Sequence, residues 1–303
     1  MKNIKQIHKG ITLAFAASVI SGIAIFYSKI SVVKIDPLIL ATARNSYVGI
    51  IFLLLFLLTN NLKQISKLSK KELLTLLIIG IVGGSISFYL FFSGIKLIGA
   101  QSANMIHKSL FIWVAILGIF TLKEKVKVNY IITGVLVCIG TYFFAPFTPK
   151  FGKGEQLVLI ATIFWSIENV LAKKILSKTS SELVALFRMV VGGVILVLIT
   201  LFSGKGKLLI GLNFMQWKTI FVGGSILFFY VFTWYRALKY APISLVSLIL
   251  TFSLVVGNML SVSFTRIPLL KNDLYTTICI VAAMGVLIIP FIKKFRLFIR
   301  PHE

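Results

Sequence analysis

The sequence predicts an all-α membrane protein of ten transmembrane helices, arranged as two inverted five-helix repeats. Three observations predict this class: an apolar composition, ten long apolar segments, and a match between the two halves of the chain. Of the 303 residues, 58% are hydrophobic and 13% are charged, and the mean hydropathy is +0.99. This apolar share is well above that of ordinary soluble domains, so a water-soluble fold is excluded.

Ten apolar segments are long enough to cross a bilayer as helices. A hydrocarbon layer of about 30 Å requires about 20 residues at a rise of about 1.5 Å per residue. Charged or turn-forming residues separate most of the segments from one another. The predicted spans are 11–30, 38–58, 73–95, 101–121, 128–146, 156–175, 182–202, 216–236, 241–263 and 272–292.

The formal net charge of +24 comes mainly from residues between the apolar segments. In a soluble chain this charge would suggest nucleic-acid binding, but no basic groove with aromatic residues accompanies it. Nucleic acid is therefore excluded as a partner, and the lipid bilayer is the predicted partner. With the N-terminus inside, the cytoplasmic loops carry nearly twice as many Lys and Arg residues as the opposite loops. This bias predicts a multi-pass plasma-membrane protein with both termini in the cytoplasm.

The two halves of the chain match at an offset of 143 to 145 residues. Arg44 aligns with Arg188, and Gly80 aligns with Gly223. Each half contains five spans, and an odd number means that the second copy enters the membrane from the opposite side. Inverted repeats are typical of secondary transporters, whose solute site lies near the membrane midplane. The predicted repeats cover residues 1–147 and 148–303.

Several motifs recur in the same order in the two halves, and together they resemble the EamA family of the drug/metabolite transporter superfamily. They are an Arg near the start of the second helix of each half, and the helix ends Gly94-Ile95-Lys96, Ala237-Leu238-Lys239 and Leu122-Lys123-Glu124-Lys125. The second half has Thr265-Arg266-Ile267 where the last of these motifs would recur, so a role of Glu124 is not expected twice. The resemblance implies an exporter or facilitator of metabolites such as amino acids. It also implies a central cavity lined by the first, third, fourth, sixth, eighth and ninth helices.

Charged residues inside the apolar spans are the first candidates for a solute site. Each costs roughly 2.5 to 3.5 kcal/mol to insert and usually faces the protein interior. Lys108 follows His107 in the fourth span, while Glu168 and Asn169 follow Trp165 in the sixth. Lys108 and Glu168 either form an ion pair with each other or contact solute or a proton. His107 is either a proton relay or a neutral side chain held by a neighbouring helix.

Two tyrosines and two arginines are further polar candidates within the spans. Tyr89 and Tyr230 are predicted to contact solute, because a phenol deep in a span needs a hydrogen-bond partner. Arg44 and Arg188 are interpreted as structural, tying helix ends together or reaching the interface. The predicted solute-binding residues, arranged around a zwitterion such as an amino acid, are Lys108, Glu168, Asn169, Trp165, His107, Tyr89 and Tyr230.

The leading functional hypothesis is a secondary transporter of small-molecule solutes that works by alternating access, with proton coupling left open. The alternative is a membrane-embedded enzyme or flippase that acts on a lipid-linked substrate. An enzyme would need clustered His, Asp or Glu residues, but of these only His107 and Glu168 lie well inside the spans. No metal or cofactor is predicted, because the sequence has neither metal-ligand spacings nor a Gly-rich phosphate loop.

Overall fold

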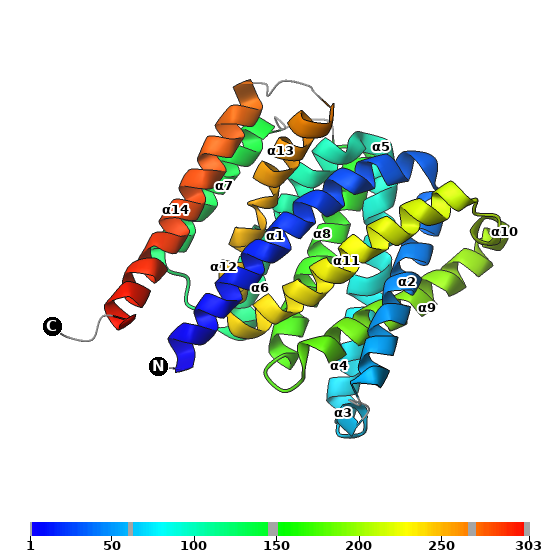
Figure 1. The fold of residues 1–303 in the computed structure, drawn as a ribbon, viewed down its shortest axis with the longest axis horizontal. Coiled ribbons are helices and arrows are strands. Elements are labelled where there is room, and N and C mark those ends of the chain that lie inside the picture. The colour runs from blue at the N-terminus through cyan, green and yellow to red at the C-terminus, as the bar shows by residue number, and fades with distance from the viewer. Residues whose placement is uncertain (1, 60–62, 145–150, 266–270, 300–303) are drawn as a thin grey trace.

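The computed structural model describes residues 2–59, 63–144, 151–265 and 271–299, and every regular element within these ranges is helical. Figure 1 shows them as one bundle, with the start of the first helix and the end of the last on the same side. The elements are α1 (Lys2–Lys34), α2 (Pro37–Leu58), α3 (Lys63–Ser66), α4 (Lys70–Ile81), the π-helix η1 (Val82–Ile86), α5 (Ser87–Lys108), α6 (Leu110–Leu122), α7 (Val128–Phe144), α8 (Lys153–Ile175), α9 (Ser181–Phe202), α10 (Gly206–Ile210), α11 (Phe214–Tyr240), α12 (Ile243–Leu250), α13 (Ser253–Thr265) and α14 (Lys271–Ile299).

The helices correspond to the ten predicted spans. Within the described residues, nine helical segments are long and apolar enough to cross a membrane, and the apolar helix Val128–Phe143 is a shorter tenth. The prediction of an all-α membrane fold is therefore confirmed. The predicted boundary between the repeats, at residues 147 and 148, lies outside the described residues.

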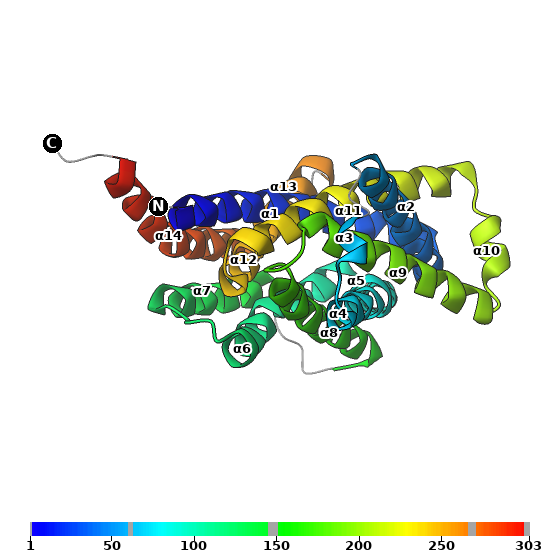
Figure 2. The ribbon, with the colours of Figure 1, turned by 90° about the horizontal axis from the view of Figure 1, so that it is seen from below.

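The packing of the helices follows the internal repeat. Helix α1 packs on α11 and helix α8 on α5, so the first span of each half contacts the third span of the other half. The second spans, α2 and α9, pack on each other, as do the fifth spans, α7 and α14. Figure 2 shows two layers, with α5, α6, α7 and α8 in one and α1, α11, α13 and α14 in the other. Exchanging the halves exchanges the layers, as the inverted repeat requires.

The fourth and ninth spans are each broken into two helices, at equivalent places in the repeat. The break between α5 and α6 lies at Ser109, whose Oγ donates to the carbonyl of Ile106 at 2.7 Å. The break between α12 and α13 precedes Ser253, whose Oγ donates to the carbonyl of Leu250, also at 2.7 Å. At each break the serine hydroxyl forms a hydrogen bond with a backbone carbonyl. Such bonds stabilise irregular backbone within the bundle. Hydropathy predicted each of these spans as one helix, because the broken and unbroken forms are equally apolar.

The third span contacts the seventh backbone to backbone through glycines. Gly84 lies in η1 against α9, and a Cβ atom at Gly84 would overlap the carbonyl oxygen of Arg188. A Cβ atom at Gly192 of α9 would in turn overlap the backbone of Gly84. Small residues allow such close approach of membrane helices. This contact holds the start of the third span's aromatic segment beside Arg188.

Replacing Gly84 with Leu is expected to destabilise the protein by about 3 kcal/mol or more, because overpacking a fitted site costs about 1 to 3 kcal/mol even where side chains can adjust. The measurement is the thermal unfolding midpoint of the purified protein in detergent. Gly257→Ala is the matched control, since nothing lies within 4 Å of a Cβ atom built there. A Gly84→Leu protein that unfolds at the wild-type temperature would contradict the close contact.

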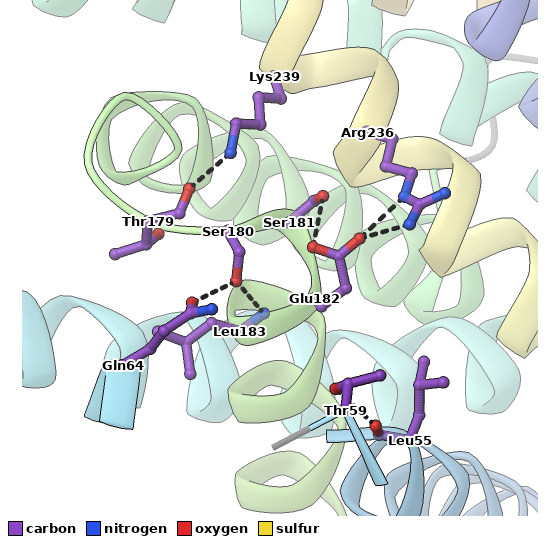
Figure 3. Close-up of polar contacts among 10 residues, drawn as sticks. All are labelled: Leu55, Thr59, Gln64, Thr179, Ser180, Ser181, Glu182, Leu183, Arg236 and Lys239. Carbon is purple, nitrogen blue, oxygen red and sulfur yellow. Dashed lines mark hydrogen bonds and ion pairs between the residues drawn. The ribbon is translucent and has the colours of Figure 1, made fainter. Parts of the chain in front are cut away.

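Polar contacts join the helix ends on the side of the termini. Figure 3 shows Arg236 of α11 donating two hydrogen bonds to Oε1 of Glu182 on α9, at 2.9 and 2.7 Å. Ser180, the N-cap of α9, donates to Oε1 of Gln64 at 2.8 Å, and Lys239 donates to the carbonyl of Thr179 at 3.1 Å. These contacts tie the seventh span to the eighth span and to the connection after the second.

The hairpin between α11 and α12 is held on the same side by two charged residues. Nζ of Lys173 donates to the carbonyls of Leu238 and Ala241 at 2.5 and 2.7 Å. The carboxylate of Glu124 accepts from the amides of Ile243 and Ser244 at 2.9 and 3.2 Å. A cation at the end of one helix and an anion at the start of the next both match the helix dipoles. Glu124 therefore holds the start of the ninth span.

On the side opposite the termini, Asp36 and Lys205 form an ion pair between two interhelical connections. Asp36 caps α2 through the amide of Leu38, and its Oδ2 lies 2.9 Å from Nζ of Lys205. Burial raises the pKa of the Asp36 carboxyl, but the hydrogen bond and charge of Lys205 and the cap bonds outweigh burial, so the pKa is lowered overall. The pair joins the start of the second span to the connection after the seventh.

Candidate functional site

A cavity lies in the middle of the bundle, between the two layers of helices. Its empty volume is ≈ 720 Å³, including the space that is open to the outside. Aromatic and aliphatic side chains line most of its wall, with a few polar groups, as is typical of small-molecule sites. The lining residues are Ser21, Ala24, Ile25, Ser28, Arg44, Phe88, Phe91, Phe92, His107, Leu110, Trp165, Asn169, Arg188, Gly223, Leu227, Tyr230 and Trp234.

Arg44 of α2 is a buried cation at the cavity wall. Its side chain is held by a 3.1 Å hydrogen bond from Nη1 to Oγ of Ser28, and its guanidinium lies 5.5 Å from the ring centre of Phe92. Gly223 leaves the space that the guanidinium occupies, because a Cβ atom there would overlap it. Arg44 is only 4% exposed, its Nε has no hydrogen-bond partner, and it makes no ion pair with any described residue. Within the described part of the chain, the cavity therefore contains a cation without a neighbouring anion.

Arg188 of α9 is the equivalent cation of the second repeat, and it does have an acidic neighbour. Its Nη2 lies 3.9 Å from Oε2 of Glu168, and the hydroxyl of Tyr235 donates to the other carboxylate oxygen at 2.5 Å. Glu168 is fully buried behind the cavity wall, where Gly83 of the π-helix makes room for it. The repeat offset of 145 places Ile23 where Glu168 stands in the second half. This difference explains why, among the described residues, Arg188 has a carboxylate partner and Arg44 does not.

The two arginines lie at equal depths from opposite sides of the membrane. Arg44 is seven residues after Pro37 at the start of α2, and Arg188 is seven residues after Ser181 at the start of α9. A rise of about 1.5 Å per residue places each about 10 Å inside its helix end. The two cations thus lie toward the two ends of the cavity.

Aromatic rings and an amide form the wall between the two arginines. The ring of His107 lies 5.0 Å from that of Trp165, and Nε1 of Trp165 donates to the carbonyl of Gly83 at 3.0 Å. Nε1 of Trp234 donates to Oδ1 of Asn169 at 2.8 Å, and its ring stacks on that of Tyr230 at 5.9 Å. These contacts hold ring faces around the cavity, where they can bind a cationic group.

Four of the seven predicted solute-binding residues line this cavity: His107, Trp165, Asn169 and Tyr230. Glu168 lies behind the wall, while Tyr89 lines a groove on the side opposite the termini, together with Asp36 and Lys205. Lys108 lines a different groove between the fourth, fifth and sixth spans.

The ion pair between Lys108 and Glu168, one of the two alternatives that the sequence left open, is wrong. Both residues are described, Glu168 lies beside Arg188 and Tyr235, and Nζ of Lys108 has no hydrogen-bond partner. His107 and Lys108 are consecutive on a helix and point about 100° apart, so one faces the cavity and the other does not.

The sequence interpretation missed the two cavity arginines, which it treated as structural. The signal that indicates them is their equivalence in the two repeats, combined with the cost of burying a charge at that depth. The family resemblance implied a different set of lining helices. The second and seventh spans contribute Arg44 and Arg188, and the ninth span contributes no lining residue in the described part of the chain. In that part, no group of three or more His, Cys, Asp or Glu residues could hold a metal ion.

Comparisons with known proteins agree with this architecture. No curated protein matches the chain. A solved structure described as "Crystal structure of protein" superposes with a TM-score of 0.76 at 14% identity, covering 95% of this chain and 98% of the other, which shows a shared fold. The model of the EamA-like transporter family matches twice, over residues 8–145 and 152–289. The chain is therefore a multi-pass membrane protein of the EamA-like transporter family, a family of transporters and not of enzymes.

Proposed function

We propose that this protein is a secondary transporter that moves small solutes with a carboxylate group, such as amino acids, through the central cavity by alternating access. The observation that carries the proposal is Arg44, a buried cation that faces an aromatic cavity and has no anionic partner among the described residues. A guanidinium can bind a carboxylate through two parallel hydrogen bonds, and such bonds are strong where water is excluded.

The remaining cavity residues suit the other end of an amino acid. The faces of Trp165 and Tyr230 attract an ammonium group, and the Asn169 amide belongs to the same wall. A zwitterion would then place its negative end at Arg44 and its positive end among the rings. Binding of the carboxylate would also compensate the buried charge of Arg44. The solute would therefore bind more tightly to the conformation that exposes Arg44 than to the other conformation.

The proposal extends to the direction in which the chain is inserted. The excess of basic residues on the side of the termini supports a cytoplasmic location for both, because positively charged loops are retained on that side. Arg44 would then lie toward the outer side and Arg188 toward the cytoplasm. In the structure, contacts of Glu182, Lys173 and Glu124 join the helix ends on the side of the termini, which would be the cytoplasmic side.

The proposal is tested by counterflow in proteoliposomes loaded with amino acids. We expect exchange of amino acids but not of the matching amines or amides, because these lack the carboxylate that Arg44 would bind. Running the same assay with and without a pH gradient shows whether protons are coupled to transport. Equal exchange of an amino acid and its decarboxylated amine would contradict a carboxylate site, and liposomes without protein provide the background.

A further inference from the structure

A second hollow lies outside the central cavity, at the edge of the layer formed by α5 to α8. This groove has an empty volume of ≈ 950 Å³, including the space open to the outside. Its wall is mostly apolar and includes Ile112, Trp113, Cys138, Tyr142 and Phe151, together with Lys108. None of these residues lines the central cavity.

The groove begins at the helix ends opposite the termini and reaches Lys108. Lys108, Cys138 and Leu159 are each six residues from that end of the fourth, fifth and sixth spans, at Ser102, Phe144 and Lys153 respectively. At about 1.5 Å per residue, all three lie at a common depth of about 9 Å. Tyr142 and Phe151 lie nearer the helix ends and are 60% and 44% exposed. The groove therefore connects the membrane interface with the side chain of the buried Lys108.

Lys108 has no compensating group among the residues that the structure describes. It is 2% exposed, its Nζ has no hydrogen-bond partner, and it forms no ion pair within the described part of the chain. An isolated buried charge is costly and normally has a partner. The position equivalent to Lys108 in the second repeat is Phe252, whose ring packs on Phe15 at 5.7 Å. The fold therefore accepts an apolar residue at this break, so the break itself does not require the ammonium group of Lys108.

We propose that this groove binds one anionic phospholipid from the leaflet opposite the termini. Its phosphate oxygens are the missing partner of Nζ of Lys108, and an acyl chain lies along the apolar wall. The four-carbon stem of a lysine lets its ammonium extend toward the headgroup region from this depth. A lipid with net negative charge compensates Lys108, whereas a zwitterionic lipid brings its own ammonium and leaves the total charge positive. The site is independent of the solute proposed for the central cavity.

The test is lipid binding by the purified full-length protein, measured by native mass spectrometry with phosphatidylglycerol or phosphatidylcholine added. We expect one phosphatidylglycerol to bind, and Lys108→Met to weaken that binding by about tenfold or more, as expected for loss of a charged hydrogen bond. Lys108→Arg should retain the binding. Lys174→Met, which removes an exposed lysine on the other side, is the matched control and should bind like the wild type.

Thermal unfolding in the two lipids separates lipid binding from a structural role. Phosphatidylglycerol should raise the unfolding temperature of the wild type but not that of Lys108→Met, which should be at least as stable as the wild type in phosphatidylcholine. Thr141→Trp fills the groove while keeping Lys108, and it should also lose the lipid. The proposal is overturned by undiminished phosphatidylglycerol binding to Lys108→Met, or to Thr141→Trp if Lys108→Met does not fold. Equal binding of phosphatidylcholine by the wild type would also overturn it.

Discussion

Replacing Arg44 with Gln is expected to lower amino-acid transport by about tenfold to a hundredfold, while the amount of folded protein stays close to that of the wild type. The loss corresponds to about 1.5 to 3 kcal/mol, because a neutral amide offers the carboxylate a weaker hydrogen bond in place of the two charged bonds of a guanidinium. Folding should tolerate the change, because Arg44 makes no ion pair with a described residue. The measurement is the initial rate of counterflow per molecule of reconstituted protein.

Two further variants make the Arg44 test specific. Arg44→Lys should also transport poorly, because a single ammonium cannot replace the two parallel hydrogen bonds of a guanidinium. Lys218→Gln removes an exposed cation near the start of α11 and should leave the rate unchanged. If Arg44→Gln transports amino acids at the wild-type rate with the same half-saturating concentration, Arg44 does not bind the carboxylate.

Replacing Glu168 with Gln is expected to destabilise the protein by roughly 3 to 5 kcal/mol, the cost of removing one member of a buried ion pair. The substitution leaves Arg188 buried without its negative neighbour and weakens the acceptor for Tyr235. The readout is the unfolding temperature of the purified protein, together with transport per folded molecule. Glu155→Gln is the control, because Gln can keep the capping contact that Glu155 makes with the amide of Gly152.

The double variant Glu168→Gln, Arg188→Met tests the pair itself. Removing both charges should restore much of the lost stability, because no unpaired charge then remains, and the energies of the two changes should not add. Transport should stay low if Arg188 serves solute on the side of the termini. A single Glu168→Gln variant as stable as the wild type would show that Arg188 does not depend on this carboxylate.

The central cavity could be predicted in part from the sequence. A polar or aromatic residue deep in a span is a candidate site residue whatever its neighbours are. This criterion correctly predicts four residues that line the central cavity: His107, Trp165, Asn169 and Tyr230. Lys108 satisfied the same criterion, yet it lies in the lateral groove. Sequence position gives the depth of a residue in the membrane but not the direction in which the side chain points, and the break at Ser109 changes that direction further.

The ten spans, the five-plus-five repeat and the family resemblance follow from the order of residues in the chain. Hydropathy and repetition are properties of the chain that tertiary contacts do not alter. Which charges meet depends on how the helices pack. This packing places Glu168 beside Arg188, leaves Arg44 without a described anionic partner, and separates Lys108 from the central cavity. The physical reason is that a charge pair depends on helix rotation and on close packing at glycines such as Gly83 and Gly223, and neither follows from the order of residues along one helix.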